Sequence, residues 1–250
     1  MAFISPIFAN ISSGIDKYKW KTAFAYPQNN NVSQPLNFPE ALPWIKEKSI
    51  YMALNELKSL EFNPKDISYL KNMGVNLPFK SGKEAVDYIA KQNIRILYEP
   101  TSESGVHAQY DFYKNLIIIN QKYKNTDDFP VILAIAEAIL HETGHAKDND
   151  AYSSIQEELD FLGMNAIAHR AFLKKYGDLF SDAKEPIIKD GVRLYAKLFF
   201  DPDPNKMALV NRISEKYGDL PSGDNVHPPR ELARKIKKQT NISTSNCKAL

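Results

Sequence analysis

The spacing of apolar residues changes along the chain and separates helical segments from a small region of strands. Apolar side chains recur with the period of a helix over residues 39–60, where a proline interrupts the pattern, and again over residues 66–73. Ser81 stands three residues before Glu84, a capping-box pattern that predicts the start of a third helix. The first part of the chain is therefore predicted to be helical, after an irregular stretch over residues 1–36.

Alternation of apolar and polar residues, which is typical of strands, follows these helices. Residues 94–98 place apolar side chains on both sides of Arg95, and residues 107–112 and 116–120 form a further pair of strand candidates. The Tyr-Lys-Asn tripeptide between the last two segments predicts a hairpin turn. We expect residues 116–120 to form an edge strand, to which an extended peptide could add by backbone hydrogen bonding.

The rest of the chain again shows helical patterns with clear starts. Asp128 before Pro130 predicts one helix start. The next start is marked by two overlapping capping boxes, Ser153 with Gln156 and Ser154 with Glu157. The predicted helices span residues 130–147, 153–175, 186–199 and 229–238. Helices, then a small sheet, then more helices indicate an α+β fold rather than an alternating α/β fold.

Composition and charge narrow the class of protein. The chain is 43% hydrophobic and 25% charged, as is usual for a globular protein. Its 32 Lys+Arg nearly balance its 30 Asp+Glu, and so small a net charge argues against a nucleic-acid partner. The single cysteine, Cys247, excludes a disulfide framework and a cysteine-based zinc site. The longest apolar run, residues 131–140, is shorter than the ~20 residues of a membrane span, and the N-terminus lacks the basic segment of a signal peptide. We therefore expect a cytoplasmic protein without a transmembrane segment, with leaderless secretion as the alternative; the oligomeric state stays open.

The strongest chemical signal is the sequence His141-Glu142-Thr143-Gly144-His145, near the end of one predicted helix. Histidines four residues apart stand above one another on a helix face, so both imidazoles can reach one metal ion. The glutamate beside the first histidine can then take a proton from a metal-activated water. The pattern predicts one Zn²⁺ bound by His141 and His145, with Glu142 as the general base.

A catalytic zinc ion takes a third protein ligand, and the nearby carboxylates are those of Asp148, Asp150, Glu157, Glu158 and Asp160. At roughly 100° per residue, Glu158 falls on the buried face of the second long helix, where a carboxylate needs a partner such as a metal. Because only a short loop joins the two long helices, they should pack as antiparallel neighbours and bring Glu158 toward His145. Glu158 is the predicted third ligand. Glu157, expected on the polar face as a solvated first-turn carboxylate, is the alternative.

Other polar residues are expected to support this site or to belong to the fold. Asn165 and His169 share the buried face of the predicted third ligand, and we expect them to be hydrogen-bonded interior residues or partners of the ligands. Asp148 could orient a ligand histidine or simply end its helix. His107 is predicted to be an ordinary residue of the sheet.

The motif and the glutamate that follows it resemble those of the gluzincin metallopeptidases, in which the third ligand is a glutamate on the next helix. The order of elements over residues 81–176 is similar to the N-terminal half of that fold. A downstream His-Pro-Pro at His227 resembles a motif of the family that includes CaaX prenyl proteases and the heat-shock and mitochondrial quality-control peptidases. It implies that His227 lies near the metal as a ligand or a transition-state contact. Two features depart from that family: the spacing of thirteen residues from His145 to Glu158 is shorter, and the Glu-x-x-Ala-Asp signature is absent.

The resemblance implies a zincin-like α+β domain over residues 76–240, in which a small mixed sheet packs on the active helix. A helical extension over residues 1–75 would precede it, and a disordered tail over residues 241–250 would follow. The leading hypothesis is a zinc-dependent peptidase acting on a peptide or protein substrate, with His227 or Tyr195 as the oxyanion donor. The alternative is a catalytically silent zinc-binding interaction module, against which the intact general base argues.

Overall fold

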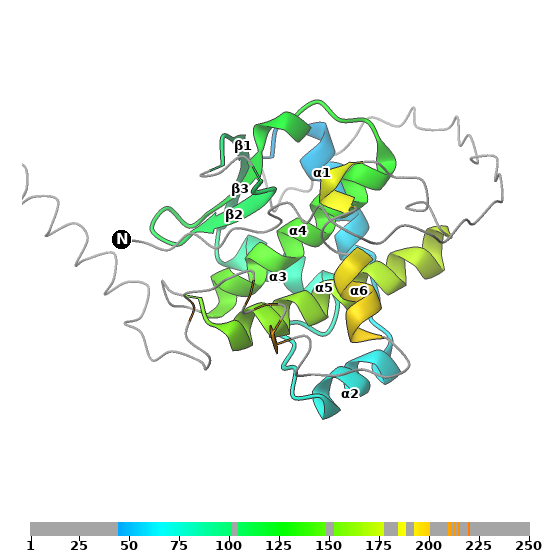
Figure 1. Ribbon diagram of the computed structural model, residues 1–250. Helices are drawn as coiled ribbons and strands as arrows, with labels where there is room; N and C mark the ends of the chain where they lie inside the picture. Colours follow the sequence, from blue (N-terminus) through cyan, green and yellow to red (C-terminus); the bar gives the residue numbers. More distant parts are fainter. Residues whose placement is uncertain are drawn as a thin grey trace, which may run out of the picture.

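The structure is a computed structural model, described over residues 45–101, 105–148, 153–177, 185–188 and 193–200 and at residues 210, 211, 213, 215 and 220. Within these residues it has six α-helices, one 3₁₀ helix and a three-stranded mixed sheet, so the predicted α+β class is confirmed (Figure 1). The predicted helix at 229–238 and the candidates Asp150 and His227 lie outside the described residues.

Two short helices open the described part of the chain. Helix α1 spans Lys48–Lys58, within the helical pattern predicted over residues 39–60. Residues 45–47 precede it in a non-helical conformation, and residues 39–44 lie outside the described residues. Helix α2 spans Pro64–Asn72 and begins two residues before its predicted start. The Asn63 side chain accepts a hydrogen bond from the Lys65 amide at 3.0 Å and so caps this helix, whose first residue is a proline.

Helix α3, Gly82–Lys91, begins directly after Ser81, as the capping pattern predicts. The Ser81 hydroxyl accepts a hydrogen bond from the Glu84 amide at 3.2 Å, while the Glu84 carboxylate accepts one from the Lys80 amide at 2.8 Å. The start of α3 also lies against the end of α1. A Cβ built on Gly82 would lie 1.8 Å from the carbonyl oxygen of Leu57, so only glycine fits at this crossing.

The sheet contains β1 (Arg95–Glu99), β2 (Ala108–Asp111) and β3 (Leu116–Asn120) in the order β1-β3-β2. β1 pairs with β3 in parallel, and β2 pairs with β3 in the predicted hairpin. The hairpin turn ends at Asn115, whose φ of 51° lies in the left-handed region that asparagine tolerates better than most residues.

The prediction that residues 116–120 form an edge strand is wrong. β3 is the central strand, with β1 on one side and β2 on the other, and all five of its residues are buried. The physical reason is the parallel pairing with β1, a contact between strands distant in sequence that the hairpin pattern does not contain. Among the described strands, the edges are therefore β1 and β2.

Two long helices follow the sheet. A 3₁₀ helix, Gln121–Tyr123, leads into α4 (Phe129–Asp148), and α5 (Ile155–Tyr176) comes next. Helix α6, Arg193–Phe199, packs on α5 and is the described part of the helix predicted over residues 186–199, together with a short helical stretch at 186–188.

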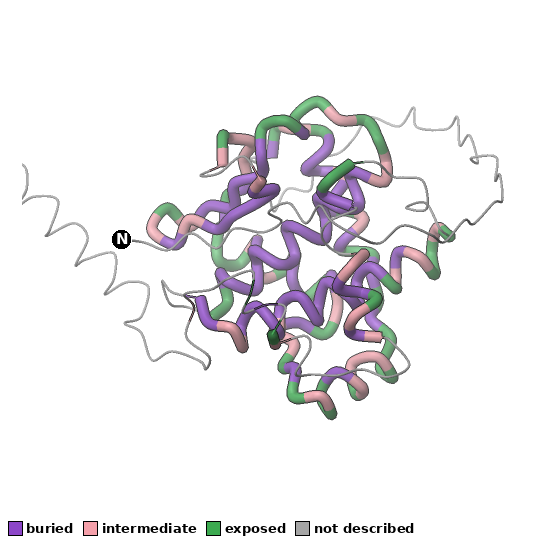
Figure 2. The backbone as a smooth tube through the Cα atoms, in the orientation of Figure 1, coloured by how far each residue is buried: buried purple, intermediate pink, exposed green. Residues whose placement is uncertain are grey.

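Helix α4 is the centre of the fold. It contacts β2 and β3 on one side and the helices α1, α3 and α5 elsewhere around it (Figure 1). Every residue from 131 to 146 is buried, including the polar ones (Figure 2). The apolar core is one cluster to which α1, α2, α3, the sheet, α4, α5 and α6 all contribute. The polar side chains of α4 therefore sit inside a protein interior, where each needs a partner.

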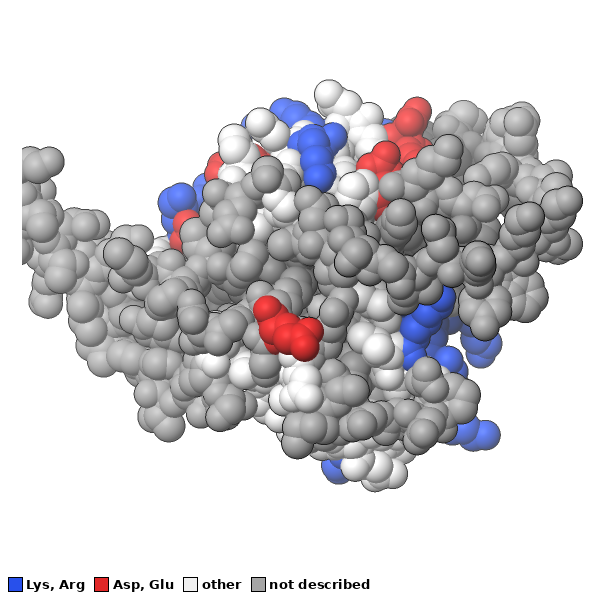
Figure 3. Space-filling model, viewed as in Figure 1, with Lys and Arg blue, Asp and Glu red and all other residues white. Residues whose placement is uncertain are grey.

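The charges on the described surface and the apolarity of the described helices agree with the small net charge and ordinary hydrophobic content of the sequence. On the face shown in Figure 3, positive and negative side chains of the described residues occur in several separate places. None of the described helices combines the length and the apolarity that a membrane span needs.

Candidate metal centre

The two histidines of the His-Glu-x-x-His motif lie on one face of α4, as the i, i+4 spacing predicts. His141 is fully buried and His145 is 8% exposed. Their ring centroids are 5.1 Å apart, with the planes tilted by 58°. Two imidazoles are thus held side by side near the end of a buried helix.

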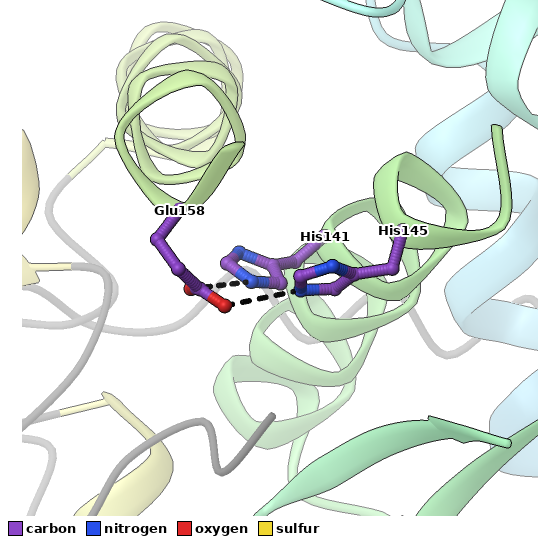
Figure 4. Close-up of side chains that lie close together, drawn as sticks. All are labelled: His141, His145 and Glu158. Carbon is purple, nitrogen blue, oxygen red and sulfur yellow. Dashed lines mark ion pairs between the residues drawn. The ribbon is translucent and has the colours of Figure 1, made fainter. Parts of the chain in front are cut away.

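Glu158 reaches this pair from α5 (Figure 4). Its Oε2 atom lies 3.4 Å from Nε2 of His141, and its Oε1 atom lies 3.4 Å from Nε2 of His145. The carboxylate is 0% exposed. The structure therefore brings together the three residues that the sequence predicts as ligands, with one candidate atom from each within 4.8 Å of the others.

These distances fit one small metal ion. Two ligand atoms that each lie about 2.1 Å from a tetrahedral ion are about 3.4 Å apart. Both nitrogen–oxygen distances in the cluster have that value, although each involves a different oxygen of the Glu158 carboxylate. Two imidazoles and one carboxylate are also a donor set that divalent transition metals accept, so the cluster could hold a metal ion.

Three further contacts between polar side chains show how α4 and α5 are aligned. Glu137 contacts His169, His141 contacts Asn165, and His145 contacts Ser153. From Glu137 to His145 the residues of α4 contact partners with decreasing residue numbers, from His169 back to Ser153. The two helices therefore run in opposite directions, as the short loop predicts.

Glu157, the alternative ligand, is not part of the cluster. Its amide donates to the Ser154 hydroxyl, and its carboxylate accepts from the Ser154 amide, each at 3.2 Å, which forms a complete capping box. The expectation of a solvated residue is wrong, because Glu157 is only 5% exposed. Its side chain turns back onto the start of α5, and this local bond buries it beside the site.

Each candidate ligand histidine has a polar neighbour at its second ring nitrogen. The side-chain amide nitrogen of Asn165 lies 3.5 Å from Nδ1 of His141, and the Ser153 hydroxyl oxygen lies 3.4 Å from Nδ1 of His145. The Ser153 oxygen can accept the Nδ1 proton of His145, and that tautomer leaves Nε2 as the nitrogen that could bind a metal. The Asn165 NH₂ group can only donate, so it pairs with an unprotonated Nδ1 of His141. Asn165 is the interior polar partner that the buried face predicts. The sequence predicts Ser153 only as a helix cap, and no local pattern indicates its place beside His145.

The pKa values of the cluster follow from burial and from close charges. Burial by itself raises the pKa of Glu158, but the two imidazoles outweigh it and hold that pKa well below its usual range. Burial lowers the pKa of His145, but Glu158, with smaller effects from Glu142 and Glu157, raises it to about 9. The carboxylate and the imidazoles therefore each favour the charged form of the other.

Glu142 is fully buried next to the motif histidines. Burial raises the pKa of its carboxyl to about 8, the charge of His145 lowers it, and Glu158 raises it. The backbone N–H of Tyr110 on β2 lowers it as well. The Glu142 carboxylate is thus close to Tyr110 of β2, and the charges of His145 and Glu158 act on it.

Several other predicted residues have structural partners outside the cluster. His169 bonds Glu137 at 3.1 Å in the core, and His107 lies directly before β2 with Nδ1 2.5 Å from the Tyr123 hydroxyl. Asp160 accepts a hydrogen bond from the Asn76 amide at 2.8 Å. The other two predicted residues are Asp148, exposed at the end of α4, and Tyr195, buried on α6.

Comparison of the chain with protein-family models, with curated proteins and with solved structures gave no match in any of the three.

Proposed function

We propose that this protein is a zinc-dependent metallopeptidase of the gluzincin type. The observation that carries the proposal is the buried cluster of His141, His145 and Glu158 with Glu142 beside it. A site that only stabilised the fold would not need a further buried acid next to the ligands, because burying an acid is costly. A hydrolytic site needs such an acid as its general base.

The residues have distinct roles in this proposal. His141, His145 and Glu158 would hold the ion through two nitrogens and one carboxylate oxygen, three protein ligands in all. When bound, zinc would supply Lewis acidity toward a water molecule and a substrate carbonyl. Glu142 would accept the proton of the attacking water and deliver it to the leaving amine.

The proposal includes a place for the substrate along the sheet. In the described part of the chain, β2 pairs on one side only, with β3, and Tyr110 of β2 is close to Glu142. An extended peptide that added to β2 would lie along the strand nearest the general base. The substrate strand predicted for residues 116–120 is thus reassigned to residues 108–111. Tyr195 and His227 stay candidates for the oxyanion donor.

The test combines metal analysis with a peptide-library cleavage assay on the wild type and on Glu142→Gln. The amide is nearly isosteric with the carboxylate but cannot accept the proton, so the variant should keep stoichiometric zinc and lose cleavage by at least about 100-fold. Cleavage near the wild-type rate in Glu142→Gln would refute the assigned base. Zinc bound by a wild type that cleaves no peptide would favour a silent zinc-binding module instead.

A further inference from the structure

We propose that Phe161 is a positioning residue for both candidate ligand histidines and that Gly144 is the place on α4 that admits its ring. This inference rests on the proposed metal centre and adds the packing that orients its imidazoles. Neither residue offers a metal ligand, so their role must act through the histidines.

The Phe161 ring lies against both imidazoles. Its centroid is 4.7 Å from that of His145 and 5.8 Å from that of His141, with planes at 86° and 83° to them. Both arrangements are the edge-to-face contact that aromatic rings prefer. Phe161 belongs to α5, one turn after Glu158, and is 4% exposed. The helix that carries the candidate carboxylate ligand therefore also carries the ring that packs on the two nitrogen ligands.

Gly144 is the residue of α4 over which this ring passes. A Cβ built on Gly144 would lie 2.8 Å from Cδ1 and 2.9 Å from Cγ of Phe161, closer than real Cβ contacts. The obstacle is the body of a buried ring between two helices, so the ring would have to shift. Because the ring also contacts His141 and His145, such a shift would change the orientation of the imidazoles.

The expected effect is on metal affinity more than on folding. An imidazole that is already held in its binding rotamer loses less conformational entropy when it coordinates an ion. Without the ring, the histidines would lose one of the contacts that order them before the metal binds. Changes to the immediate surroundings of metal ligands typically cost 10- to 100-fold in affinity. We expect the lower end of that range here, because Phe161 constrains the rings by packing alone.

The chain offers a matched control for Gly144→Ala. Gly163 is also buried inside a long helix, and a Cβ built there would lie 2.7 Å from Cγ1 of Val75, a contact as tight as that at Gly144. Its other near neighbours are Leu70 and Phe199, away from the histidines. Gly163→Ala therefore imposes a similar packing strain without pushing on Phe161.

The experiment measures zinc affinity by chelator competition, thermal unfolding without metal, and the visible spectrum of the Co²⁺-loaded protein. Gly144→Ala should weaken zinc binding about tenfold and shift the Co²⁺ bands. Gly163→Ala should lower the unfolding midpoint while leaving affinity within about twofold and the spectrum unchanged. Equal effects of the two variants on affinity would overturn the inference. A wild type that binds no zinc would instead overturn the proposed function, and this inference with it.

Phe161→Leu keeps an apolar side chain and tests the ring directly. It should weaken zinc binding about tenfold by itself. Adding Gly144→Ala to it should cost less than about twofold more, because the ring on which the new methyl group would press is gone. Wild-type affinity in Phe161→Leu, or fully additive losses in the double variant, would overturn the role of the ring even if Gly144→Ala failed to fold.

Discussion

Two adjacent glutamates at the start of α5 have different proposed roles: Glu158 is the candidate metal ligand, and Glu157 caps the helix. We predict that Glu158→Ala and Glu157→Ala cost similar stability but differ sharply in zinc binding. The Glu158 carboxylate lies 3.4 Å from both candidate histidine ligands, whereas the Glu157 carboxylate accepts the Ser154 amide at 3.2 Å. The two variants remove the same chemical group one residue apart.

The stability of Glu157→Ala follows from its capping box. Removal of the carboxylate leaves the buried amide of Ser154 without this acceptor, at a cost of about 1–3 kcal/mol. Loss of a negative charge from the first helical turn adds about 0.3–1 kcal/mol. The expected loss of stability is larger than for a solvated first-turn carboxylate, because Glu157 is only 5% exposed. At about 2–4 °C per kcal/mol, the unfolding midpoint should fall by several degrees.

Glu158→Ala should lose a similar amount of stability without metal. The attraction between its carboxylate and a charged imidazole is about 5 kcal/mol at 3.4 Å and an effective dielectric constant of 20. The cost of burying both charges offsets most of this attraction. Zinc affinity should fall by more than about 100-fold, because even a partner outside the ligand shell is worth 10- to 100-fold. At 1.4 kcal/mol per decade, this exceeds about 2.8 kcal/mol.

The assay is zinc competition against a chromophoric chelator, with thermal unfolding in excess chelator as the stability measurement. Glu157→Ala should bind zinc within about twofold of wild type, and Glu158→Ala should not bind it stoichiometrically. The reasoning is refuted if Glu157→Ala loses zinc while Glu158→Ala retains it, since the ligand would then lie on the other face of α5.

Three further predictions concern the ligands, a buried phenol and a helix crossing. His141→Ala and His145→Ala should each abolish stoichiometric zinc, because two remaining ligands hold the ion poorly; a double variant that still bound zinc would contradict the site. Burial raises the pKa of Tyr98 to about 12 from an unfolded value of about 10, so its contribution to stability is complete below pH 10 and is lost as pH rises toward 12. In urea titrations, the stability of wild type relative to Tyr98→Phe should therefore fall by up to about 3 kcal/mol over that range, and a constant difference would disprove the linkage. Gly82→Ala should cost about 3 kcal/mol or more in chemical unfolding, since its Cβ would meet the Leu57 carbonyl at 1.8 Å; a cost below 1 kcal/mol would show that α3 can shift freely.

Features of this protein that depend on nearby residues could be predicted from sequence. The starts of α3 and α5 depend on hydroxyl caps and the amide three residues later, and both are observed at Ser81 and Ser154. The hairpin turn depends on Asn115, and the two motif histidines share a face because they are one helical turn apart. Such relations span at most a few residues, so a local pattern contains them.

The prediction of Glu158 combined local and long-range reasoning. Helix periodicity predicts that Glu158 lies on the inward face of its helix. The short loop before that helix predicts that it packs antiparallel to α4, which brings Glu158 toward the histidines. Periodicity failed for Glu157, because a side chain that caps its own helix turns toward the helix start and leaves the face that its position predicts.

The tertiary structure alone decided the remaining features. β3 is central because β1 pairs with it from the far side, and this pairing has no signature within either strand. Ser153 and Phe161 reach the histidines only because α5 packs on α4 in one particular register. The sequence by itself determined which residues could bind a metal, since that depends on donor type and helical spacing. The packing of α5 on α4 decided which side chains surround them, because contacts between helices depend on the whole core and not on any single segment.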